Sequence, residues 1–146
     1  MKMIALNHAL TGAAIGLAVQ KPYLVIPLAF ASHFVLDAVP HFGHKVYEYG
    51  GKYATKIYIA DGIATVLGLG LTALYAPHLI LPALVGAFFA MLPDVFWLHY
   101  YRSGRPQTWF YKFHQKIQWF ERPPGAFVEA SYLVFIGTTI SALTFK

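Results

Sequence analysis

Four of the six acidic side chains of this 146-residue chain lie in its apolar segments, as do two of its seven histidines, His8 and His33, although ionisable groups are rare in such segments. In hydrocarbon such a group is costly unless it is paired, bound to a metal or turned towards water. The clearest pair is His33 and Asp37, which a helix presents on one face at positions i and i+4. This spacing offers an imidazole nitrogen and a carboxylate oxygen to one cation. The alternative is a purely structural pair that hydrogen-bonds between helices.

Further candidates lie near the same ends of the apolar segments. With a helical rise of ~1.5 Å per residue, all of them fall within ~10 Å of one membrane boundary. The predicted metal ligands are His8, His33, Asp37, His41, Asp61 and Asp94. The spacing does not fix the direction of His41, because Pro40 ends or kinks the helix before it. Glu129 is a weaker candidate, since the helix dipole favours a glutamate in a first turn.

These imidazoles and carboxylates form a mixed ligand set. Such a set suits Zn²⁺, Mn²⁺ or Fe²⁺ better than Mg²⁺ or Ca²⁺, and we expect a divalent metal, zinc foremost. The chain has no cysteine, which argues against a closed thiolate site, and the number of candidates leaves room for a second ion. A carboxylate that is not a ligand would act as general base. Asp61 and Asp94 are the predicted catalytic residues; Glu129 stays open for the same role.

The composition places these residues in a membrane. The chain is 58% hydrophobic and 12% charged, with a mean hydropathy of +0.52, whereas soluble domains are roughly 25% charged. Apolar stretches near bilayer-spanning length cover residues 4–19, 23–39, 57–75, 79–98 and 126–143. We therefore predict one all-α domain over residues 1–146, an integral membrane bundle of about five transmembrane helices.

The first four stretches resemble two duplicated hairpins. His8 and Asp61 are offset by 53 positions, as are His41 and Asp94. Small residues in the first and third stretches predict close approach of helix backbones there. The glycines concerned are Gly12, Gly16, Gly62, Gly68 and Gly70.

The basic residues predict the orientation. Nine of the eleven Lys and Arg residues fall in the N-terminus and the loops 40–56 and 99–125, which share one face. The positive-inside rule makes that face cytoplasmic. We expect a multi-pass protein of the inner (cytoplasmic) membrane with a cytoplasmic N-terminus.

Residues 106–120 predict an amphipathic helix lying in the membrane interface. Its apolar arc contains Trp109, Phe110, Phe113, Ile117 and Phe120, and its polar arc contains His114. This helix is an anchor or, alternatively, a lid or lipid-headgroup contact over the site. His99 and His114 are candidates only for contacts to the ligands or the substrate. No nucleic-acid partner is expected.

Three motifs suggest a family. His8 opens a Gly/Ala-rich helix, residues 32–41 read Ser-His-x-x-x-Asp-x-x-Pro-His, and residues 92–94 read Leu-Pro-Asp. In these motifs the chain resembles small membrane proteins grouped as membrane-bound metal-dependent hydrolases. The resemblance implies a multi-helix inner-membrane protein with metal ligands among His8, His33, Asp37 and Asp94. The chain lacks the downstream His-Arg-x-x-x-His-like element of many such proteins.

Taken together, these features predict a membrane-embedded metal-dependent hydrolase with a His/Asp site near the cytoplasmic face. The expected partner is membrane lipid, and the expected substrate is a phospholipid or another amphiphilic ester. Two alternatives stay open: a membrane binding or scaffold protein whose buried His–Asp pairs fix helix register, and a metal or ion transporter. The sequence does not indicate the oligomeric state.

Overall fold

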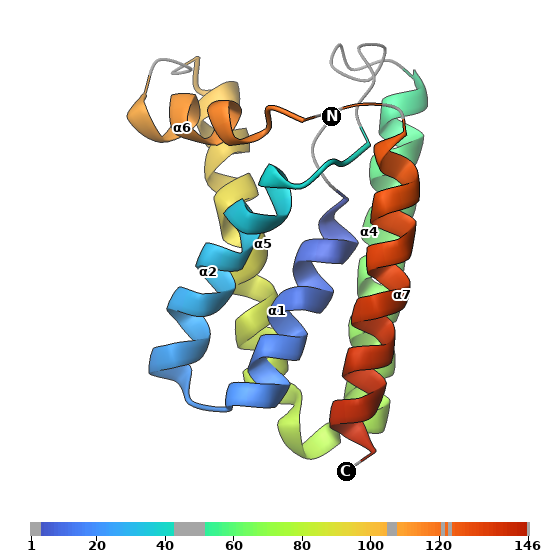
Figure 1. Ribbon diagram of the computed structural model, residues 1–146. Coiled ribbons are helices and arrows are strands. Elements are labelled where there is room, and N and C mark those ends of the chain that lie inside the picture. Colours follow the sequence, from blue (N-terminus) through green and yellow to red (C-terminus); the bar gives the residue numbers. More distant parts are fainter. Residues whose placement is uncertain (1–3, 43–51, 105–107, 121, 123, 146) are drawn as a thin grey trace.

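The computed structural model describes residues 4–42, 52–104, 108–120, 122 and 124–145, and these residues form helices and no β-strand (Figure 1). This confirms the all-α prediction. The elements are α1 (Ala5–Val19), α2 (Pro22–Ala38), α4 (Lys52–Tyr75), the 3₁₀ turn η1 (Pro77–Leu79), α5 (Ile80–Arg102), α6 (Trp109–Ile117) and α7 (Gly125–Thr144).

Three segments are long and apolar enough to cross a membrane, as expected of a membrane protein: Thr55–Tyr75, Pro77–Trp97 and Gly125–Thr144. They belong to α4, to η1 with α5, and to α7. The helices α1 and α2 are apolar but shorter, at 15 and 17 residues. The helical conformation is interrupted between them, next to Lys21 and Pro22, and α2 ends just before Pro40. Five spans are therefore not confirmed.

The helix α1 forms the centre of the bundle. It packs against α2, α4, α5 and α7, and eleven of its residues are buried. The surrounding α4 and α7 instead leave large apolar side chains exposed, as lipid-facing helices do. The core is thus a single central helix and the faces turned towards it.

Glycines allow α1 and α5 to cross closely. A Cβ atom on Gly12 would overlap the backbone carbonyl of Gly86, and one on Gly86 would overlap that of Gly12. Gly16 lies equally close to the backbone of Pro82. The predicted close approach therefore occurs here. It does not occur at Gly62 or Gly70, where an added Cβ would meet nothing within 4 Å.

The two ends of the bundle differ. The hairpins α1–α2 and α4–α5 both turn at the end where the C-terminus lies, while the N-terminus and α6 lie at the opposite end (Figure 1). The two hairpins thus run in the same direction; their duplication stays a prediction.

The helix α6 lies across this end of the bundle, over α2 and α5 (Figure 1). It is shorter than predicted: residues 105–107 lie outside the described part, and the helix begins after Thr108, whose hydroxyl accepts a hydrogen bond from the Tyr111 amide at 3.4 Å. Trp109 is exposed, as an interfacial helix requires. His114, from the polar arc, is buried against the bundle.

Candidate metal centre

Five ionisable side chains from four helices meet at the end of the bundle that α6 covers. They form two groups whose possible ligand atoms lie within 4.8 Å of one another, and His33 belongs to both. The side chains of His8, His33, Asp37 and His114 are fully buried, and that of Asp94 is 25% exposed. The structure therefore brings together four of the six predicted ligands and adds His114.

The geometry around Asp37 is tight. His33 Nε2 lies 3.2 Å from Asp37 Oδ2, which realises the i, i+4 spacing on α2. His8 Nε2 approaches the other oxygen, Oδ1, at 3.3 Å from α1. The rings of His8 and His33 stack with centroids 4.1 Å apart. Asp37 thus receives an imidazole on each of its two oxygens.

A backbone carbonyl fixes the tautomer of His33. Its Nδ1 lies 2.7 Å from the carbonyl oxygen of Ala90 on α5, and because a carbonyl only accepts, Nδ1 carries the proton. In the neutral ring the lone pair is then on Nε2, which faces Asp37, His114 and Asp94. Metal-binding histidines commonly have their second nitrogen held in this way.

The helix α6 supplies the third imidazole. His114 Nε2 lies 3.0 Å from His33 Nε2 and 2.8 Å from Asp37 Oδ2. Gln118, one turn later, donates a hydrogen bond to Asp37 Oδ2 at 3.1 Å. A proton on His114 Nε2 could point to only one of its two neighbours, whereas a cation would interact with both.

Asp94 completes the group from α5. Its Oδ1 lies 3.7 Å from the Nε2 atoms of both His33 and His114. It is the only member of the two groups with an exposed part. Asp94 is therefore the group that water reaches most easily.

The donor set fits a divalent metal. His8 Nε2 and Asp37 Oδ1 are buried 3.3 Å apart, and neither has a hydrogen-bond partner within the described residues. Zn–N and Zn–O bonds of ~2.0–2.2 Å in a tetrahedron separate neighbouring ligand atoms by ~3.3–3.6 Å. The separations of 3.2 and 3.3 Å around Asp37 lie close to this spacing, whereas those of 2.8 and 3.7 Å lie below and above it. These buried groups could thus hold a metal ion, with the same three ions as candidates.

Asp61 lies elsewhere. Its Oδ2 accepts a hydrogen bond from the Ala5 amide at 2.7 Å, and its Oδ1 accepts one from the Leu6 amide at 3.1 Å. The first amides of a helix lack partners within it, and Ile4 at the N-cap supplies no side-chain bond. In this structure Asp61 caps α1 instead of joining the cluster for which the sequence proposed it.

His41 and Glu129 also lie outside the two groups. The Nδ1 of His41 donates a hydrogen bond to the Val39 carbonyl at 2.9 Å. Glu129 is buried and its Oε1 accepts a hydrogen bond from the Phe42 amide at 3.0 Å. The predicted first-turn position of Glu129 is wrong, because α7 begins at Gly125 and has no acidic residue in its first turn; the carboxylate binds a neighbouring segment instead.

The sequence predicts His114 only as a contact to the ligands or the substrate, and Gln118 only as a residue of the polar arc. His114 in α6 and Gln118 at its C-cap are at positions i and i+4, the same spacing that singled out His33 and Asp37. The amphipathic pattern of residues 106–120 predicts that this polar arc faces water and lipid headgroups. In the structure His114, which belongs to the arc, turns inward to the cluster. A His-x-x-x-Gln pair on an otherwise solvated face was the available signal.

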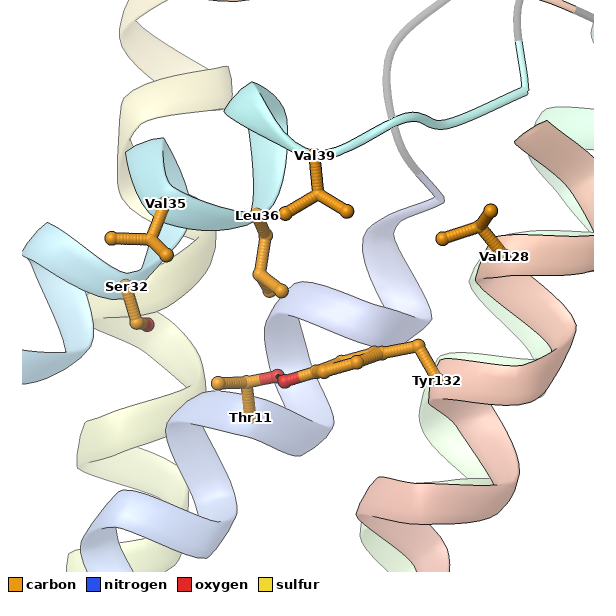
Figure 2. Close-up of a pocket in the computed structure, with 7 residues that line it drawn as sticks. All are labelled: Thr11, Ser32, Val35, Leu36, Val39, Val128 and Tyr132. Carbon is orange, nitrogen blue, oxygen red and sulfur yellow. Dashed lines mark hydrogen bonds between the residues drawn. The ribbon is translucent and has the colours of Figure 1, made fainter.

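An apolar groove of about 300 Å³ lies between α1, α2 and α7 (Figure 2). Ser32 and Leu36, which line it, each precede a cluster residue in α2. Tyr132 reaches across from α7 to Thr11 on α1, with the two hydroxyl oxygens 2.7 Å apart. Since Thr11 donates to the Asn7 carbonyl, Tyr132 donates to Thr11. The other lining residues are Val35, Val39 and Val128.

Comparison with known proteins gave no match among family models, curated proteins or solved structures.

Proposed function

We propose that this protein is a membrane-embedded metal-dependent hydrolase that acts on an ester or phosphoester of an amphiphilic lipid near one membrane face. The observation that supports it best is the convergence of the Nε2 atoms of His8, His33 and His114 on the buried carboxylate of Asp37. Three histidines are the ligand set of several catalytic zinc sites.

In this proposal His8, His33, His114 and Asp37 hold one metal ion, zinc foremost. One ion is favoured over two because the single lone pair of His33 Nε2 is shared by both groups. When bound, the metal supplies Lewis acidity and a water of lowered pKa. Gln118 keeps Asp37 in place through its hydrogen bond to Oδ2.

Asp94 is the proposed general base. It lies farther from the imidazoles than Asp37 does, at 3.7 Å, and its side chain is the one partly exposed. A carboxylate in this position can take a proton from water and return it to the leaving group. Asp61 is not assigned this role, because its two oxygens bind the amides of α1.

An apolar groove on α1 and α2, the helices that also carry His8, His33 and Asp37, favours a lipid substrate over a water-soluble one. The groove beside α2 is lined mainly by apolar side chains, and Val35 in it is 65% exposed. An acyl chain could occupy this groove while its polar end approaches the cluster. Because α6 covers the buried ligands, substrate entry requires α6 to shift or a path past Asp94.

A multi-pass protein of the inner membrane with a cytoplasmic N-terminus remains part of the proposal. The basic residues support it: at the end of the bundle with α6, the exposed side chains include Arg102, Lys112, Lys116 and Arg122. The site would then face the cytoplasmic leaflet, and the exposed Trp109 would lie among the headgroups.

The first test is the metal content of detergent-purified protein, measured by elemental analysis. We expect near-stoichiometric zinc, manganese or iron in the wild type, its loss in His33→Ala and His114→Ala, and its retention in His78→Ala. His78 is exposed in η1 at the opposite end of the bundle and is the matched control. Wild-type protein that stays metal-free in excess ions would leave the cluster as a hydrogen-bonded scaffold.

Hydrolysis is tested separately. Metal-loaded protein is assayed against lipid esters and phosphoesters in mixed micelles, beside Asp94→Asn. We expect the variant to keep its metal and lose activity by about 10²–10⁴-fold. Equal activity in both proteins would refute the role of Asp94, and metal flux into proteoliposomes without hydrolysis would favour a transporter.

A further inference from the structure

The helix α6 is the only element of the cluster outside the main bundle. It has nine residues, well below the ~12–15 at which an isolated helix becomes even marginally stable. Its placement over the cluster therefore depends on its contacts with α2 and α5 and on the chain segments at its ends. The position of His114 is set from outside α6.

The segment after α6 pairs with the segment after α2. The His41 amide donates a hydrogen bond to the Phe120 carbonyl at 3.4 Å, and the Arg122 amide donates one to the His41 carbonyl at 3.0 Å. The Arg122 guanidinium also lies over the Phe120 ring, 4.9 Å from its centroid. These contacts join the chain leaving Asp37 to the chain leaving His114.

The helix α7 contacts the paired segments that follow α2 and α6. Glu129 is 4% exposed, and its carboxylate accepts the Phe42 amide at 3.0 Å and a further backbone hydrogen bond from Ile4. Gly125 lies so close that an added Cβ would overlap the backbone carbon and oxygen of His41. We call these residues the clasp: His41, Phe42, Phe120, Arg122, Gly125 and Glu129.

We infer that Glu129 is a positioning residue for His114: through the clasp, its buried carboxylate holds α6 over the metal site. This inference rests on the proposed metal site. Glu129 belongs to neither group of candidate ligands, so it acts through Phe42, the bridge at His41 and the start of the segment that follows α6. Removing its carboxylate takes away the hydrogen bond that Glu129 accepts from the Phe42 amide, which loosens the bridge.

The predicted consequence is specific. His8, His33 and Asp37 stay in place, because α1 and α2 belong to the bundle. The metal keeps these ligands and loses His114. A Glu129→Ala protein should therefore behave as a His114→Ala protein does, with a metal affinity 10–100-fold below that of the wild type.

Cobalt(II) is the probe for the test, because its visible absorption reports the number and type of its ligands. We would titrate Co²⁺ into wild type, Glu129→Ala, His114→Ala and the double variant in detergent, with Ser131→Ala on the exposed face of α7 as control. We expect both single variants to share one altered spectrum and the double variant to bind no more weakly than His114→Ala. Glu129→Gln, whose amide oxygen can accept the Phe42 hydrogen bond, should recover at least part of the affinity.

A wild-type spectrum and affinity for Glu129→Ala would overturn the inference. The inference would also be overturned if the metal affinity of the double variant fell by the product of the two single fold-changes. That result would mean that the two free-energy changes add, as they do for independent sites.

A second measurement does not depend on metal. The chain has no cysteine, so spin labels at Lys116→Cys on α6 and Leu28→Cys on α2 report the distance between these helices. Glu129→Ala should broaden this distance distribution, and an unchanged distribution would overturn the clasp. If the wild type binds no metal but the distribution broadens, the proposed function fails and the clasp stands.

Discussion

Replacing Asp37 or Asp94 by asparagine, one at a time, should distinguish the roles of the two carboxylates of the site. Asparagine keeps the shape of aspartate and removes its charge. Asp37 is fully buried with imidazole nitrogens of His8, His33 and His114 at 3.3, 3.2 and 2.8 Å. Removing one partner of a buried charge pair costs about 3–5 kcal/mol. Asp37→Asn should therefore bind zinc roughly a hundredfold to several thousandfold more weakly.

Asp94→Asn should behave differently. Its side chain is 25% exposed and lies 3.7 Å from the nearest imidazole nitrogens, so its charge is screened by solvent. Solvent-exposed ion pairs contribute about 0.2–1 kcal/mol, which corresponds to at most about a fivefold loss of affinity. Hydrolysis, in contrast, should fall with Asp94→Asn even when the metal site is full.

Competition between the protein and a chromophoric chelator for Zn²⁺ measures both affinities in the same detergent. Circular dichroism of each variant shows whether the helices persist. Zinc affinity of Asp37→Asn within tenfold of the wild type would refute the claim that Asp37 is the central ligand. A larger effect for Asp94→Asn than for Asp37→Asn would show that burial does not rank these two groups.

Three stability predictions use heat unfolding in detergent as their measurement. Gly86→Ala should destabilise by about 1–3 kcal/mol, because its Cβ meets the Gly12 carbonyl, whereas Gly70→Ala faces open space and should not destabilise. Asp61→Asn should cost about 0.5–2 kcal/mol through the weakened cap on α1 and should leave the metal content unchanged; metal loss would return Asp61 to the site. Tyr132→Phe removes the hydrogen bond to Thr11 and should cost about 1 kcal/mol, and a stability equal to wild type would show that this bond contributes nothing.

The part of the site that the sequence predicted is the part that helix geometry determines. His33 and Asp37 share a face because they are four residues apart, whatever surrounds them. His8 and Asp94 were predicted from their depth, which follows from the ends of apolar segments. Depth fixes a level along the bundle axis but no direction around each helix. Asp61 has a similar depth, yet its side chain turns to the first amides of α1.

The direction of His114 could not be predicted for a different reason. An amphipathic pattern is read with the apolar face inward or towards lipid and the polar face towards water. Here the interior contains a polar cluster, so the polar arc of α6 turns inward while Trp109 is exposed. That reversal depends on residues far away in the sequence. The periodicity of residues 106–120 predicted the helix correctly but not which face it would bury.

The short length of α2 has a consequence for the surrounding bilayer. Its 17 residues extend ~26 Å, less than the ~30 Å hydrocarbon layer, while the 24-residue α4 extends ~36 Å. If α2 crosses the membrane, lipids beside its exposed face must shorten to match it, at a modest cost per ångström. This hydrophobic mismatch would thin one leaflet locally and draw the ester layer of neighbouring lipids towards the level of His33 and Asp37. The length of one helix would then help to determine which lipid bonds come within reach of the site.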